Sequence, residues 1–139
     1  MVAWRMFLEL STNHLKAPRR TTPGEFNSEG DRSPLLRSWC SWTTFERLER
    51  DAGYWTRELP LIRELADTAT RDGGTWGQPF PYNELAHVMI PRRFDEEYAH
   101  AGEFHIWSHE QDIDGLSAIL CAAGIEHRLS KYVLEIRLF

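Results

Sequence analysis

Apolar and polar side chains alternate in four segments of the chain. These segments span residues 2–10, 84–90, 103–108 and 132–139. A period of two is typical of a strand that buries one of its faces. The second segment is apolar almost throughout, which predicts a central strand that is buried on both faces. Residues 126–129 are a further candidate strand, which a turn at Ser130 and Lys131 would join to the last one.

Three other segments have apolar residues at helical spacing, near residues 44–58, 61–71 and 109–123. In the first, Thr43 and Glu46 have the spacing of a capping box. Ser108 and Gln111 repeat that spacing before the third helix, and Gly124 follows it as a left-handed cap residue. The apolar stripe of the third helix predicts a buried face and includes Ile113, Leu116, Ile119, Leu120 and Ala123; Cys121 is expected to be a buried thiol.

These elements predict one α+β domain over residues 1–139, a length that is sufficient to bury a core. We expect a mixed sheet of four or five strands, with about three helices mainly on one face. The strands at 103–108 and 132–139, with the helix between them, predict a split β-α-β unit. Residues 92–101 are expected to form a loop or short helix, and the basic segment 16–38 a long loop. The second face of the sheet would be solvated or an interface, and would carry Arg5, Glu9, Glu103, His105, Trp107, Glu135 and Arg137.

The charge of the chain is unevenly distributed. The formal net charge is −5, but the segment 94–114 contains seven acidic residues and no lysine or arginine, which leaves a net charge of +2 for the rest. Such an acidic segment disfavours binding to nucleic acid. It favours either a basic protein partner or a solvated face. The chain has only two cysteines and no apolar run long enough to span a membrane, so we expect a cytoplasmic protein without membrane association.

Histidines and carboxylates occur together in the acidic segment. His100, His105 and His109 lie within ten residues among several acids, and imidazole with carboxylate is a donor set that suits zinc. Their spacing matches no known metal signature. We therefore assign no catalytic, metal or cofactor-binding residue, and a small enzyme or metal-binding protein that uses His105 and His109 remains the alternative. His87, within an apolar strand, is expected to be a core histidine with satisfied hydrogen bonds.

Tryptophan is abundant between residues 39 and 76. Trp39, Trp42 and Trp76 would suit a site that stacks on a sugar or a base. Aromatic residues in such stretches are more often anchors of a core or an interface. A ligand-binding module built on these residues is a third hypothesis.

The leading hypothesis is a non-enzymatic domain that binds a basic protein. Acidic residues steer association, and aromatic residues among them supply affinity. Toxin-neutralising immunity proteins and phage inhibitors of host defence mask basic surfaces in this way, and they provide the analogy on which the hypothesis rests. A homodimer through the uncovered face of the sheet is also possible. The predicted partner-binding residues are Asp95, Glu96, Glu97, Tyr98, Glu103, Trp107, Glu110 and Asp112.

Overall fold

The computed structural model describes residues 3–16, 38–70 and 80–139 of the chain. Its main sheet has five strands in the order β2 (Trp55–Glu58), β1 (Trp39–Thr44), β5 (Leu85–Pro91), β9 (Val133–Arg137) and β8 (Arg128–Leu129). Every pair of neighbours in this sheet is antiparallel. The α+β class is therefore confirmed, whereas the expectation of a mixed sheet is wrong.

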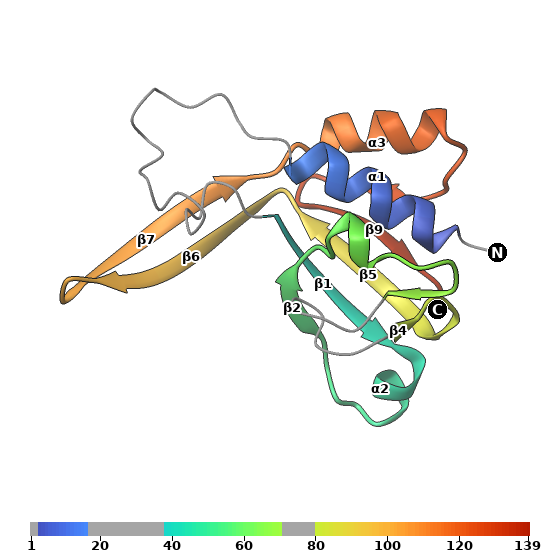
Figure 1. Cartoon of the computed structure of the whole chain (residues 1–139), viewed down its shortest axis with the longest axis horizontal. Helices are drawn as coiled ribbons and strands as arrows, with labels where there is room; N and C mark the ends of the chain where they lie inside the picture. The colour runs from blue at the N-terminus through green and yellow to red at the C-terminus, as the bar shows by residue number, and fades with distance from the viewer. Residues whose placement is uncertain (1–2, 17–37, 71–79) are drawn as a thin grey trace.

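Two helices cover one face of this sheet, α1 (Trp4–Lys16) and α3 (Ile113–Ala122), and they pack against each other (Figure 1). Between helices and sheet lies one continuous core. Its fully buried members include Phe7, Leu8, Trp42, Val88, Ile90, Leu116, Leu120 and Leu134. The remaining elements are short: α2 (Phe45–Glu49), η3 (Ile62–Glu64), η5 (Tyr82–Glu84), and a small sheet of β3 (Ala69–Thr70) and β4 (Phe80–Pro81). No helix in the described ranges has the length and apolar character needed to cross a membrane.

The predicted strand at 2–10 is wrong, because this segment belongs to helix α1. The buried side chains Trp4, Phe7, Leu8, Ser11 and Thr12 follow steps of three and four residues. The polar residues after the apolar run do not end the element. The Ser11 hydroxyl donates a hydrogen bond to the Phe7 carbonyl one turn earlier, at 2.7 Å, and Thr12 Oγ1 donates to the Pro60 carbonyl at 2.8 Å. A segment this rich in apolar residues fits the two-residue period of a strand and also the spacing of a helix. The helix is favoured because it buries Phe7.

The helices predicted near 44–58 and 61–71 are also largely wrong. The first is limited to α2, and its N-cap is Thr44, whose side chain accepts a hydrogen bond from the Arg47 amide. A turn with left-handed residues at Asp51 and Gly53 then reverses the chain into β2. The second segment contains only η3 and β3 within its described part. Aromatic and β-branched residues in 39–44 and 55–58 favour strands. The pairing of these two strands outweighs the helical spacing of the apolar residues.

The strand predicted at 103–108 exists, but it does not join the main sheet. It is β7 (Glu103–Glu110), and within the described ranges it pairs with β6 (Arg93–His100) alone, where a loop or short helix was expected. The split β-α-β unit is therefore wrong. Ser108 lies within β7, so the capping box with Gln111 is wrong as well; α3 begins at Ile113, and its N-cap Asp112 accepts from the Gly115 amide at 2.9 Å.

Three predictions in the last part of the chain are confirmed. Gly124 follows α3 with a φ of 77°, which only glycine adopts at low cost. β9 lies inside the sheet, and β8 pairs with it through the predicted turn. The Ser130 hydroxyl accepts hydrogen bonds from the amides of Tyr132 and Val133, which explains the turn. Cys121, however, is exposed rather than buried. Most of the loop predicted at 16–38 lies outside the described residues.

Candidate functional site

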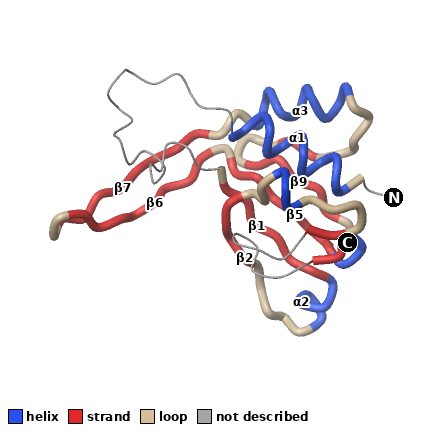
Figure 2. Tube along the Cα trace, in the orientation of Figure 1, coloured by secondary structure: helices blue, strands red, loops and turns tan. Residues whose placement is uncertain are grey.

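The strands β6 and β7 form an arm that extends away from the rest of the protein (Figures 1 and 2). Their register is regular from Arg93 opposite Glu110 to His100 opposite Glu103. The two residues between the strands are Ala101, with a φ of 55°, and Gly102, with a φ of 80°. Two left-handed residues in a two-residue loop form the tight turn that matches the twist of a β-hairpin. The arm is therefore a complete hairpin.

Seven of the eight predicted partner-binding residues lie on this arm. Asp95, Glu96, Glu97 and Tyr98 are in β6, and Glu103, Trp107 and Glu110 are in β7. Asp112 is outside it, because it caps α3 and accepts a hydrogen bond from His14 at 2.9 Å. The side chains of residues 96–100, 105 and 107 lie outside the described part of the structure. The structure thus brings most of the predicted residues together on one projecting element.

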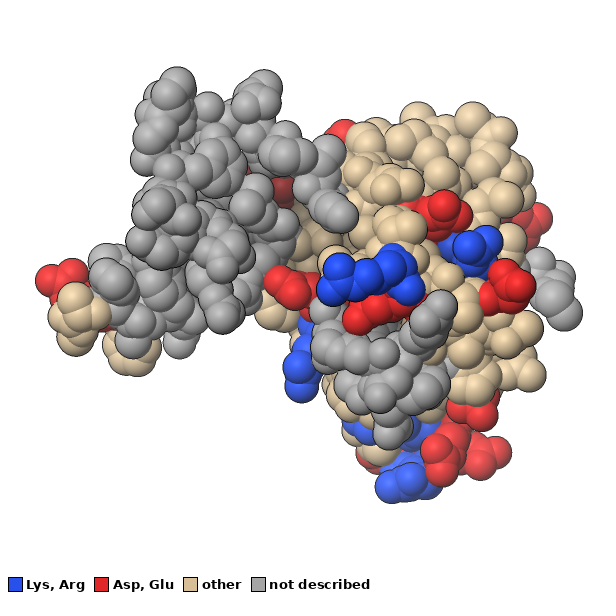
Figure 3. Space-filling model, in the orientation of Figure 1, with Lys and Arg blue, Asp and Glu red and all other residues tan. Residues whose placement is uncertain are grey.

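One face of the arm combines exposed apolar and acidic side chains. Register and alternation place several described side chains on the same face, here called the arm face: Arg93, Asp95, Phe104, Ile106, Ser108 and Glu110. Phe104 is 80% exposed and Ile106 is 68% exposed. The sequence pattern had predicted that these two residues face a core, and this is wrong because nothing packs on β7 from that side among the described residues. Glu103 pairs with His100 beside the turn, so it lies at the outer end of the arm, where Figure 3 shows acidic atoms.

The charged side chains of the arm face are ordered by short contacts. Ser108 Oγ donates a hydrogen bond to Asp95 Oδ1 at 2.8 Å, and it accepts one from Arg93 Nη2 at 3.1 Å. Arg93 Nε also lies 3.7 Å from Asp95 Oδ1. All of these groups are on the exposed surface, so their contribution to stability is small. Their effect is to fix the position of the Asp95 carboxylate.

A buried glutamine joins the arm to the main sheet. Gln111 accepts a hydrogen bond from the Trp39 amide at 2.8 Å and donates to the carbonyls of Trp39 and Pro91 at 3.1 and 2.9 Å. Its own amide donates to the Arg92 carbonyl at 2.7 Å. Nearby, the Phe94 ring packs on Trp39 at 5.3 Å and stacks on His109 at 4.8 Å between ring centroids. The base of the arm is therefore anchored, whereas its outer part is exposed.

Of the three histidines in the acidic segment, only His109 has a described side chain, and it belongs to no recognisable metal centre among the described residues. His109 is 8% exposed and lies in the aromatic cluster at the base of the arm. Its backbone is four residues from that of His105, roughly 13 Å along an extended strand. Among the side chains that the structure describes, no three histidine, cysteine or carboxylate groups are close enough to hold one metal ion. His100 and His105 have undescribed side chains, so the alternative based on them stays a prediction.

A second cluster of polar groups lies on the face of the main sheet opposite to α1 and α3. This face, here called the open face, carries Thr43, His87 and Arg137 in one row and Ser41, Met89 and Glu135 in the next. Glu135 and Arg137 were predicted here, but Arg5 and Glu9 are on α1 and residues 103–107 are in the arm.

His87 is the centre of this cluster. It is 5% exposed and hydrogen-bonds to two side chains: Tyr54 Oη lies 2.7 Å from Nδ1, and Glu135 Oε1 lies 2.6 Å from Nε2. The prediction that His87 is a core histidine with satisfied hydrogen bonds is confirmed. No local sequence pattern predicts its two partners, because Tyr54 and Glu135 are 33 and 48 residues away. A histidine within an apolar strand was the only available signal.

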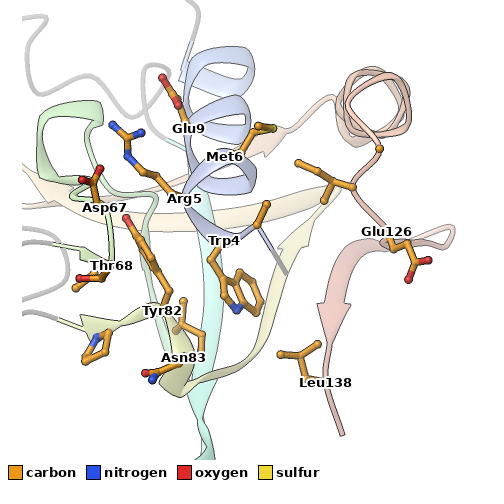
Figure 4. Close-up of a pocket in the computed structure, with 16 residues that line it drawn as sticks. Trp4, Arg5, Met6, Glu9, Asp67, Thr68, Tyr82, Asn83, Glu126 and Leu138 are labelled. Carbon is orange, nitrogen blue, oxygen red and sulfur yellow. The ribbon is translucent and has the colours of Figure 1, made fainter. Parts of the chain in front are cut away.

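An open groove of about 1440 Å³ lies between the start of α1, the small β3–β4 sheet and the end of α3 (Figure 4). On one wall, Arg5 points toward Asp67 and Tyr82. Burial raises the pKa of Tyr82; Arg5 opposes this shift and Asp67 adds to it. The Tyr82 hydroxyl is already used, because it donates to the Ala66 carbonyl at 2.7 Å. Glu9, Asn83 and Glu126 complete a mixed polar lining that does not select one class of ligand.

The tryptophans whose side chains the structure describes do not gather into one stacking site. Trp42 is 1% exposed and stacks on Trp55 within the core, at 5.6 Å between ring centroids. Trp39 points to the other face of β1 and packs against Phe94. Trp76 lies outside the described residues. The hypothesis of a ligand site that combines Trp39 and Trp42 is therefore wrong, because the two rings lie on opposite faces of β1.

Comparison with known proteins does not add a function to this geometry. No known protein family, no curated protein and no solved structure matches the chain.

Proposed function

We propose that this protein is a binding domain whose β6–β7 arm docks on a partner protein with a basic surface. The observation that carries the proposal is the arm face. Phe104 and Ile106 are among the most exposed large apolar side chains, and Asp95 and Glu110 lie on the same face. Exposed apolar residues flanked by charge are typical of surfaces that bind another protein.

The two kinds of side chain have separate roles in this proposal. Phe104 and Ile106 supply affinity, because they would lose their contact with water when the partner covers them. Asp95, Glu103 and Glu110 accelerate association with a basic surface and select against acidic ones. The anchored base keeps the arm in one orientation, since Gln111 and the aromatic cluster hold it against β1. Toxin-neutralising and defence-inhibiting proteins are the functional classes that the proposal favours.

A charge-reversal experiment tests this proposal. The arm variant replaces Asp95, Glu103 and Glu110 by lysine, and a matched control replaces Glu49, Glu84 and Glu126, which are exposed on other elements. Both variants change the net charge equally. Affinity capture from the source cell should recover a basic protein with the wild type and the control, and lose it with the arm variant.

The dependence of binding on ionic strength is the second test of this proposal. The association rate with the captured partner should fall as salt increases, because the interaction of exposed charges is screened over about 8 Å at physiological ionic strength. Equal capture by both variants, or a partner whose binding does not depend on salt, would overturn the proposal. If the partner is a second copy of this chain, sedimentation of the purified protein will show a dimer without added partner.

A further inference from the structure

The Tyr54–His87–Glu135 cluster on the open face has the connectivity of a nucleophile, a base and a supporting acid. Carboxylates accept hydrogen bonds and do not donate them when ionised, so the contact of Glu135 with Nε2 places the imidazole proton on Nε2. Nδ1 of the neutral ring then has a lone pair. With the ring in this neutral form, the contact of Tyr54 with Nδ1 is a hydrogen bond that the phenol donates. This is the direction that proton transfer from the phenol to His87 requires.

The three residues of this cluster differ in how far solvent can reach them. The His87 side chain is 6% exposed and that of Glu135 is 14% exposed, so water has little access to the base and its acid. Tyr54 is 39% exposed, so it is more accessible than the base and the acid. The Phe139 ring packs edge-on against His87 at 5.7 Å and covers another side of the imidazole. Of the three residues in the cluster, Tyr54 is therefore the one that a substrate would reach first.

The turn that presents Tyr54 is held by several contacts. Asp51 has a φ of 56°, which is unfavourable for a residue with a side chain, and Gly53 has a φ of 83°. The Gly53 carbonyl accepts hydrogen bonds from Thr43 Oγ1 at 2.8 Å and Arg47 Nε at 3.1 Å. Arg47 Nη2 also donates to the Ala52 carbonyl at 2.7 Å. Backbone strain that neighbouring groups hold in place is common at functional sites.

We propose that Tyr54 is a nucleophile that accepts an acyl group from an activated ester, with His87 as its general base. In the first step, Tyr54 Oη attacks the carbonyl carbon while its proton moves to His87 Nδ1. The bond from the carbonyl carbon to the leaving oxygen breaks, and that oxygen takes the proton from Nδ1. The products are O-acyl-Tyr54 and an alcohol or phenol. Glu135 positions the ring and stabilises the imidazolium that exists between the two proton transfers.

A water molecule completes the cycle by the same route. His87 Nδ1 takes a proton from water as the water oxygen attacks the acyl carbon. The bond to Tyr54 Oη breaks, a carboxylic acid is released, and the proton on Nδ1 returns to the phenolate. This activity is independent of the arm, because none of its residues lies in β6 or β7.

The test uses p-nitrophenyl acetate and maps acetylation of the intact protein by mass spectrometry. Tyr132 is the internal reference, since it is 72% exposed and has no imidazole among its described contacts. General-base assistance typically contributes 10²-fold or more, so Tyr54 should be acetylated at least about tenfold faster than Tyr132. His87→Gln should reduce the Tyr54 rate by about a hundredfold and leave Tyr132 unchanged.

Glu135→Gln separates a chemical role from a structural one. The glutamine carbonyl can still accept the Nε2 hydrogen bond, so the ring keeps its orientation, but the negative charge is lost. The Tyr54 rate should fall about tenfold in this variant while its thermal midpoint changes little. Equal rates at Tyr54 and Tyr132 in the wild type would overturn the proposal, whether or not the variants fold. An unchanged Tyr54 rate in folded Glu135→Gln would overturn the role of the carboxylate and with it the relay.

Discussion

The main sheet and the arm are both antiparallel β-structure, but different interactions hold them in place. The sheet buries one face under α1 and α3, and its central side chains, such as Trp42 and Val88, are at most 1% exposed. In the part of the chain that the structure describes, the two strands of the arm pair only with each other, and Phe104 and Ile106 remain exposed on it. Packing therefore stabilises the sheet, whereas backbone pairing and the anchored base support the arm. An element that is not needed for the core is available for a partner.

The largest contrast between the two regions should come from removing one aromatic side chain in each. Trp42→Ala deletes a ring that stacks on Trp55 inside the core, and should lower the free energy of unfolding by about 3–5 kcal/mol. Phe104→Ala deletes an exposed ring, and should change it by no more than about 0.5 kcal/mol. Urea denaturation followed by circular dichroism measures both. Similar losses in the two variants would mean that the arm is part of the cooperative core.

The second largest effect on stability is expected at Gln111, which joins the arm to the main sheet. Gln111→Ala removes a side chain that satisfies the Trp39 amide and two carbonyls in a buried position, and should cost about 2 kcal/mol or more. Gln111→Glu is the matched control: it can accept from Trp39 but cannot donate to the carbonyls. Hydrogen exchange should show faster exchange of the Trp39 amide in the alanine variant. Unchanged protection there would argue against Gln111 as the anchor.

Acid should weaken the main body through two carboxylates near the start of α3. The Gly115 amide and then His14 lower the pKa of Asp112, and Arg92 lowers that of Asp114, from an ordinary value of 3.8. A carboxylate with a lowered pKa stabilises the fold above its ordinary pKa, and this stabilisation is lost as the pH falls through the folded-state value. Unfolding measured from about pH 5 down to pH 2 should show this loss.

Asp112→Asn is the control for this pH dependence. Asparagine caps helices well, so the hydrogen bond from Gly115 can persist without the charge. The acid limb of the stability curve should become shallower in this variant. A limb of unchanged slope would assign the acid sensitivity to other groups.

The sequence was most informative where local chemistry decides the structure. The strand at 84–90, the cap at Gly124 and the turn at Ser130 follow from apolar runs, glycine and side-chain hydrogen bonds within a few residues. Sequence patterns led to wrong predictions of two kinds. In α1, the apolar residues fit the period of a strand as well as that of a helix. In β1 and β2, pairing between two separate segments determines the structure. The acidic site was located from charge alone, but its exposure depends on where β7 pairs. The partners of His87 are 33 and 48 residues away, beyond the reach of a local pattern.

Site-specific photo-crosslinking in the source cell tests the proposed role of the arm most directly. A photoreactive amino acid would replace Phe104 on the arm face, and in a second variant Tyr132, which is similarly exposed on the main body. We expect one predominant crosslinked protein at position 104 that is absent at position 132, and that disappears when Asp95, Glu103 and Glu110 are replaced by lysine. The same crosslinked species at both positions, or none at position 104, would contradict the account.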